Sequence, residues 1–179
     1  LNISNLNLYN QDILKFNLQN LSDGIQIIGN LPYNISSPII FKFLKNRIWG
    51  RMVIMLQDEV ARRIIAKAGK KDYGRISIMV QSLCTVKYEF KISPHVFTPK
   101  PKVNSAIISI IPKPNIDFEF KLLERIVSNA FKHRRKKLSN NLKNVIPNKE
   151  LEKIKDNRAE ELTIEQYQAL SKLIVKNKI

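Results

Sequence analysis

A short apolar strand that runs into a proline turn and then a helix start constrains this chain more than any other stretch. It reads Ile27-Ile28-Gly29-Asn30-Leu31-Pro32-Tyr33-Asn34-Ile35-Ser36-Ser37-Pro38. Pro32 fixes its own φ and biases Leu31 toward an extended backbone, so the turn is stiff. Ser37 is placed to cap a helix with Pro38 at its first position. Because open α/β sheets bind ligands beyond the carboxyl ends of their strands, the turn is a candidate site.

The residues of this turn suit methyl transfer to the amino group of a base. The exocyclic amine of adenine is a poor nucleophile, because its lone pair is delocalised into the ring. The Asn30 side-chain oxygen and the Pro32 carbonyl can both accept hydrogen bonds from such an amine and hold it in line with an electrophilic methyl group. Tyr33 offers a flat face on which an extruded base can stack. A strand followed by a proline turn, with Tyr33 in the core, is the purely structural alternative.

The net charge points to nucleic acid as the partner. The chain has 179 residues, 44% of them hydrophobic, which is enough for one medium domain and a small appendage. Its formal net charge is +16, and a chain this basic binds polyanions readily. No apolar run reaches the length of a membrane span and no signal peptide is visible, so we expect a cytoplasmic protein without a membrane partner.

The metal-ligating and redox-active residues are sparse. Cys84 is the single cysteine, which excludes an internal disulfide and suits a reducing cytoplasm. With only His95 and His133 as histidines, we expect no metal site. The oligomeric state has no sequence signal, and a monomer is the default expectation.

Apolar periodicity predicts alternating strands and helices in the first two thirds of the chain. Such alternation favours a mostly parallel α/β sheet, with the last two strands as an antiparallel edge. The nearly continuous apolar run at 51–57 predicts a strand covered on both faces. We expect strands at 5–10, 26–29, 51–57, 86–92 and 105–111, and helices at 38–45, 58–68 and 76–83.

A second, helical part follows Pro112-Lys113-Pro114-Asn115. Its first helix has an apolar stripe and leads into the basic cluster Lys132–Lys137, and its last helix opens with a capping box formed by Thr163 and Gln166. We therefore predict two domains, at 1–114 and 115–179.

Several blocks of the sequence together resemble the ribosomal RNA adenine dimethyltransferase family. They keep the family's order and spacing across essentially the whole chain. The blocks are Gly29–Ser36, Leu56–Val60, Tyr73–Ser77, Phe97–Ala106, Phe131–Lys136 and Arg158–Leu162.

The resemblance implies a fold, an activity and a set of site residues. The fold is a Rossmann-like class I methyltransferase sheet followed by a small all-α domain that helps to hold RNA. The reaction is transfer of methyl groups from S-adenosylmethionine to N6 of two adjacent adenosines near the 3′ end of small-subunit ribosomal RNA, in the immature small subunit. The catalytic matches are Asn30, Leu31, Pro32, Tyr33 and Phe97, the last closing over the target base opposite Tyr33. The cofactor matches are Asp12, Asn30 and Leu31.

Basic side chains beside these motifs are candidates for contacts with RNA phosphates, which position RNA without reading its sequence. In isolation, such a run is usually a solvated helix end. The candidates are Lys100, Lys102, Lys132, Arg134, Arg135 and Lys136.

The chain departs from the family at the cofactor loop. The family has a Gly-rich loop after its first strand and then an acidic residue for the cofactor ribose. None of the five glycines here forms a Gly-x-Gly loop. We therefore expect that the N-terminal part of the methyltransferase sheet is missing, and that this chain is inactive alone.

Two other functions stay open at this point. Antibiotic-resistance methyltransferases of large-subunit ribosomal RNA share the Asn-x-Pro-Tyr turn and the Pro-Lys-Pro-Lys-Val loop, although the blocks at Tyr73–Ser77 and Arg158–Leu162 favour the small-subunit enzyme. A non-catalytic ribosome-assembly factor is the second alternative, since the Gly-rich loop is lacking.

Overall fold

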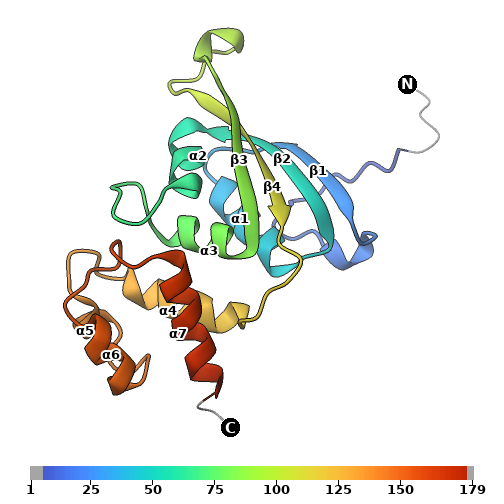
Figure 1. The fold of residues 1–179 in the computed structure, drawn as a ribbon. Coiled ribbons are helices and arrows are strands. Elements are labelled where there is room, and N and C mark those ends of the chain that lie inside the picture. The colour runs from blue at the N-terminus through green and yellow to red at the C-terminus, as the bar shows by residue number, and fades with distance from the viewer. Residues whose placement is uncertain (1–5, 177–179) are drawn as a thin grey trace.

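The computed structural model describes residues 6–176, the last three by their backbone alone. A four-stranded sheet stands beside a helical region formed by the C-terminal third of the chain (Figure 1). In chain order the elements are η1 (Leu18–Asn20), β1 (Ile25–Asn30), α1 (Ser36–Lys45), β2 (Trp49–Gln57), α2 (Asp58–Ile65), α3 (Arg75–Leu83), β3 (Cys84–Ile92), η2 (Pro94–Val96), β4 (Ser105–Pro112), α4 (Phe120–Ala130), α5 (Leu138–Asn141), α6 (Asn148–Ile154) and α7 (Ile164–Lys176).

The sheet has the strand order β1-β2-β4-β3. β1 and β2 run parallel, while β4 is antiparallel to both of its neighbours. The expected antiparallel edge is therefore confirmed, but the expectation of a mostly parallel sheet is wrong for the described residues. β4 returns from β3 through the loop at 93–104 and lies between β3 and β2, and antiparallel neighbours need no crossover helix.

In the part of the chain that the structure describes, helices cover one face of this sheet (Figure 1). Met52, Ile54 and Leu56 of β2 point into the core under α1, α2 and α3 and are at most 1% exposed. On the opposite face, Ile28 is 87% exposed and Ile111 is 47% exposed. On β2 itself, Val53 and Met55 of this second face are half-buried, so the prediction that the 51–57 strand is covered on both faces holds only in part for the described residues. Parallel strand pairs are normally buried on both faces, so this open face is unusual.

The expected strand at 5–10 is also absent where the structure describes it. Residues 6–10 have no strand partner, because β1 pairs only with β2 in the described part of the chain. An extended segment becomes a strand only when a neighbour accepts and donates its backbone hydrogen bonds. Leu8 is 87% exposed, while Tyr9 packs edge-on against Phe16 with ring centroids 5.2 Å apart.

The predicted helices around the sheet form, with shifted ends. α1 begins at Ser36 without a side-chain cap, so Ser37 is not its N-cap and Pro38 is its third residue. α2 ends at Ile65, three residues early, and a loop follows in which Gly69 has a φ of +78°. The Gly69 amide donates to the Glu160 carbonyl at 2.8 Å, which ties this loop to the helical region.

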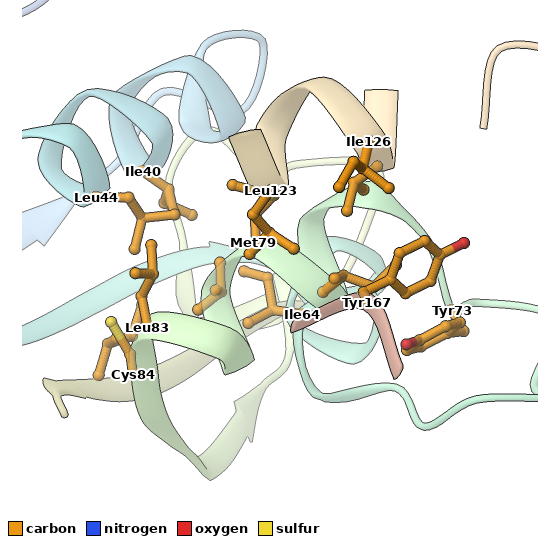
Figure 2. Packing of buried hydrophobic residues seen from close by; sticks show 14 of the residues in the cluster. Ile40, Leu44, Ile64, Tyr73, Met79, Leu83, Cys84, Leu123, Ile126 and Tyr167 are labelled. Atoms are coloured by element: carbon orange, nitrogen blue, oxygen red, sulfur yellow. The ribbon is translucent and has the colours of Figure 1, made fainter. Parts of the chain in front are cut away.

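The sheet layer and the helical region share one hydrophobic core. Figure 2 shows Leu44 of α1, Met79 of α3 and Leu123 of α4 in this core. Two buried tyrosines lie at the far end of this core: the Tyr73 hydroxyl donates to the Leu162 carbonyl at 3.0 Å, and the Tyr167 hydroxyl donates to the Ala159 carbonyl at 2.8 Å. The domain division at 114 remains a prediction, placed between the end of β4 and the start of α4.

The capping box of the last helix is confirmed. The Thr163 amide donates to Oε1 of Gln166 at 2.8 Å, and the Gln166 amide donates to Oγ1 of Thr163 at 3.3 Å. These two bonds satisfy amides that the first turn of α7 would otherwise leave unpaired.

Candidate active site

A cavity of about 340 Å³ opens at the carboxyl ends of β1 and β2. The turn after β1 forms one wall, and the proline-rich loop before β4 forms the other. The lining residues are Asn30, Leu31, Pro32, Tyr33, Met55, Phe97, Pro99 and Pro101. All five predicted catalytic residues therefore line one cavity. The structure adds three lining residues to the predicted catalytic set: Met55, Pro99 and Pro101.

The turn after β1 is rigid because its backbone is hydrogen-bonded at both ends. The Leu31 amide donates to the Met55 carbonyl at 3.0 Å, which extends the β1–β2 ladder past the strand end. The Ile35 amide donates to the Pro32 carbonyl at 3.2 Å and closes the turn. A carbonyl oxygen has two lone pairs, so the Pro32 oxygen can accept a second hydrogen bond from a ligand.

The packing behind the turn leaves little room for a side chain at Gly29. A Cβ at this position would lie 3.1 Å from Cδ2 of Leu31 and 3.7 Å from Cγ2 of Ile54. The next residue, Asn30, is exposed at the end of β1, and in the described part of the chain its side chain forms no hydrogen bond. The amide of Asn30 is therefore available to a ligand in the cavity.

The two walls of the cavity are joined through β4. The hydroxyl of Tyr33 lies 2.6 Å from Oγ of Ser105, the first residue of β4. The Asp58 amide donates to the Asn104 carbonyl at 3.0 Å, which fixes the end of the proline-rich loop on the start of α2. Tyr33 and Phe97 are both partly buried, so each presents an aromatic surface to the cavity.

A carboxylate network supports the base of this loop. Asp58 accepts from the Tyr88 hydroxyl at 2.6 Å and from Nε of Arg62 at 3.0 Å. Burial raises the pKa of Asp58, but the hydrogen bonds from Tyr88 and Arg62 outweigh it and leave that pKa below its ordinary value. Asp58 is therefore ionised at neutral pH and acts as a structural anion at the start of α2, not as a proton donor.

Asp12 does not line the cavity. It is exposed, and its Oδ1 accepts from the Leu14 amide at 2.8 Å in a local turn. Lys42 holds the same segment on α1 by donating to the Leu14 carbonyl at 2.8 Å. A cofactor role for Asp12 stays a prediction.

The predicted RNA-binding residues form two groups. Lys100 and Lys102 are exposed on the proline-rich loop, and Lys100 Nζ lies 3.3 Å from Nε2 of His95. The second group follows α4: Lys132, Arg134, Arg135 and Lys136 are all exposed. Within this group, Arg134 donates to the Lys71 carbonyl at 2.6 Å and lies 3.7 Å from Glu160.

A second, polar cavity of about 640 Å³ brings the predicted RNA-binding residue Arg134 together with three cations that sequence reasoning did not single out. Arg63, Lys71, Arg75 and Arg134 line it together with the acidic residues Glu59 and Asp72 and with Ser37, the second residue of α1. These cations come from α2, the following loop, α3 and the segment after α4. Arg63, Lys71 and Arg75 lie close together in the sequence, whereas Arg134 is distant and meets them only in the folded chain.

No cluster of three or more His, Cys, Asp and Glu residues suitable for a metal ion occurs among the residues that the structure describes. Within the same residues, no helix is long and apolar enough to cross a membrane. Cys84 is buried, and burial raises the pKa of its thiol to about 12.

The parallel β1–β2 pair, followed by an Asn-Leu-Pro-Tyr turn that lines an aromatic cavity, fits the Rossmann-like class I methyltransferase fold. Comparison with known families gives the more specific assignment. Residues 2–176 match the family model described as ribosomal RNA adenine dimethylase, and the chain belongs to this family.

The similar proteins agree with this assignment. The ribosomal RNA small subunit methyltransferase A of Pseudomonas fluorescens is 46% identical over 156 residues, which cover 83% of this chain and 57% of that protein. The protein of the same name from Coxiella burnetii is 39% identical over 179 residues, covering 95% of this chain and 69% of that protein. The chain thus spans between one half and about two thirds of the length of these relatives.

Solved structures share the fold. A dimethyladenosine transferase from Plasmodium falciparum superposes with a TM-score of 0.79 at 27% identity, covering 95% of this chain and 72% of that chain. The 23S rRNA methyltransferase ErmE superposes with a TM-score of 0.67 at 22% identity, covering 90% of this chain and 69% of that chain. At that identity, the second match supports the fold alone.

Proposed function

We propose that this chain carries the base-binding half of an S-adenosylmethionine-dependent adenine-N6 dimethyltransferase of small-subunit ribosomal RNA. It would act as a monomer on the immature small subunit in the cytoplasm. The observation that carries the proposal is the cavity in which Asn30, Pro32, Tyr33 and Phe97 meet. The names of the similar proteins support the small ribosomal subunit as the source of the substrate.

The cavity provides the contacts that a target adenine needs. Its aromatic residues, Tyr33 and Phe97, can stack on the faces of an extruded base. The Asn30 side-chain oxygen and the Pro32 carbonyl can accept hydrogen bonds from the exocyclic amine. These contacts orient the amine lone pair and favour the tetrahedral nitrogen that forms as the amine is methylated. After a first transfer, the monomethyl amine must rotate so that its remaining hydrogen still reaches one of these acceptors.

The chain fits the methyl donor in part. S-adenosylmethionine supplies an electrophilic methyl group when bound. In this chain Asn30 and Leu31 would hold it at the edge of the cavity, and Asp12 is a further candidate. A glycine-rich turn of the kind that brings backbone amides close to a nucleotide cofactor is lacking, since the five glycines form no Gly-x-Gly. We therefore propose that tight cofactor binding needs additional protein.

The basic residues offer a path for the RNA backbone. Ser37, in the first turn of α1 after the Asn30–Tyr33 turn, borders the second cavity, whose lining includes four cations and the acidic residues Glu59 and Asp72. A strand whose base enters the first cavity can therefore place its neighbouring phosphates near Arg63, Lys71 and Arg75. Such contacts position the RNA and add little sequence preference.

Methyl transfer from labelled S-adenosylmethionine into unmodified small ribosomal subunits tests the proposal. The 179-residue chain would be run beside a version extended at its N-terminus with a family-like segment that carries a Gly-rich loop. We expect transfer by the extended version only. Binding to the subunit without transfer by either version would favour an assembly factor, and transfer into large-subunit RNA alone would favour the antibiotic-resistance class.

The substitution Asn30→Ala tests the catalytic role within the extended version. We expect a loss of about 100- to 1,000-fold in the transfer rate, as found when one preorganised polar group at a reacting centre is removed. Stability should not change, because Asn30 is exposed and its side chain forms no hydrogen bond within the described residues. Asn34→Ala is the matched control: Asn34 is also exposed in the same turn region but does not line the cavity. Equal rates for both variants would contradict the assignment.

A further inference from the structure

Ser105 links the two walls of the candidate active site. Its side chain is completely buried, and its Oγ lies 2.6 Å from the Tyr33 hydroxyl, across 72 residues of sequence. Ser105 is the first residue of β4, where the proline-rich loop ends. A buried hydroxyl needs a hydrogen-bond partner, and Tyr33 is the partner that the structure provides.

The position of Ser105 is fixed more firmly than that of Tyr33. In the sheet, Ser105 pairs with Gln57 of β2 on one side and with Ile92 of β3 on the other. Tyr33 instead lies in a turn outside the sheet, where its ring can rotate about two side-chain bonds. The short hydrogen bond therefore transfers the rigidity of the sheet to the tyrosine ring.

We propose that Ser105 is a positioning residue for the target base, and that the Tyr33 hydroxyl serves as a tether while its ring is the stacking surface. The inference rests on the proposed function and deepens it. The hydroxyl lies 2.6 Å from Oγ of the buried Ser105, while the Tyr33 side chain also lines the cavity, so we assign the hydroxyl to the tether and the ring face to the ligand. A ring held at one angle stacks on a base at a lower entropic cost than a freely rotating ring.

The tether predicts a specific pattern in a double-mutant cycle. Ser105→Ala and Tyr33→Phe each remove the same hydrogen bond, so each should weaken base binding by about 2- to 10-fold, the effect of one typical hydrogen bond. The double variant should bind no more weakly than the weaker single variant, because the bond can be lost only once. If the Tyr33 hydroxyl instead acted on the substrate, Tyr33→Phe would lose far more than Ser105→Ala.

A fluorescent base makes the experiment possible with the 179-residue chain. The probe is a single-stranded oligoribonucleotide with the sequence of the 3′ end of small-subunit ribosomal RNA, in which 2-aminopurine replaces one of the two adjacent adenines. Stacking on an aromatic ring quenches this fluorophore. The titration yields an affinity and also the depth of quenching at saturation, which reports how the base and the ring are aligned.

Ser109→Ala is the matched control. Ser109 lies on the same strand, is 4% exposed, and donates to Oε1 of Glu89 at 2.6 Å, away from the cavity. A purely structural role for a serine of β4 would give the same result at both positions. We expect Ser105→Ala to reduce the quenching at saturation, while Ser109→Ala leaves it unchanged.

Each outcome is decisive. Weaker binding and shallower quenching for Ser105→Ala and Tyr33→Phe, with no further loss in the double variant, support the tether. Wild-type values for Ser105→Ala overturn the inference and leave the base site intact. Additive losses overturn it as well, because the two hydroxyls would then act separately. An unmodified chain that fails to quench the probe overturns base stacking in this cavity, and the proposed function with it.

Discussion

Arg135 and Lys136 offer the clearest test of RNA binding by the helical region. Both are exposed, and neither forms an ion pair within the described residues. Arg134 is less suitable, because it donates to the Lys71 carbonyl and lies 3.7 Å from Glu160. Substituting Arg135 and Lys136 with Gln therefore removes two charges and leaves the contacts of Arg134 in place.

The size of the effect follows from counterion release. Each phosphate contact contributes about −0.7 to the slope of log K against log salt for single-stranded nucleic acid and about −0.9 for a duplex. Loss of two contacts should make the slope shallower by about 1.4 to 1.8. With the two affinities equal at 1 M salt, this change of slope corresponds to an affinity that is lower by about 15- to 30-fold at 0.15 M salt.

The assay is a salt titration of the affinity for small-subunit ribosomal RNA. The control replaces Lys153 and Lys155 with Gln, which changes the net charge equally in the same helical region. These lysines are already paired, at 2.8 Å, with Glu150 and Glu152 respectively. We expect the control to keep nearly the full slope. Equal slopes for the two double variants would refute a local phosphate site and leave net charge as the cause.

Two further predictions concern stability. Ile28 is 87% exposed, so Ile28→Thr should change the free energy of unfolding by less than about 0.5 kcal/mol. Ile27 packs against the core, so Ile27→Thr should lower the free energy of unfolding by about 1–2 kcal/mol. Equal losses in denaturant unfolding would mean that the outer face is covered in solution. Asp58 has a lowered pKa in the folded state, so its stabilisation is present above its ordinary pKa of 3.8 and is lost as the pH falls through the folded value. Asp58→Asn should therefore remove part of the acid-side fall in stability measured by thermal unfolding, while Glu59→Gln, at an exposed ion pair, should leave it nearly unchanged.

Local sequence signals predicted most elements correctly. The alternation at 86–92, the helical spacing at 76–83 and the capping box at Thr163 depend on near neighbours along the chain, and all three are present in the structure. The prediction of a strand at 5–10 was wrong because a strand depends on residues that are distant in the sequence. Its residues have a suitable pattern, but a strand also needs a partner, and pattern alone does not show whether one is available.

The same division applies to the candidate site. The stiff turn from Asn30 to Tyr33 can be predicted from consecutive residues, because Pro32 restricts the backbone in any fold. The resemblance to a known family added Phe97, whose place in the cavity wall a periodic pattern does not reveal. Ser105 carried no signal as a site residue, since a serine at the start of a strand is ordinary.

The sequence by itself determined the turn, most of the helices and strands, and the basic character of the chain, because these follow from backbone restrictions, short-range periodicity and charge. Tertiary structure alone decided which face of the sheet stays open, which cations meet around Ser37, and which buried hydroxyl holds the Tyr33 ring. Those features depend on residues brought together from distant parts of the chain. These residues come close only when the core packs and brings elements such as α3 and α4 into contact, so no local stretch of sequence shows their proximity.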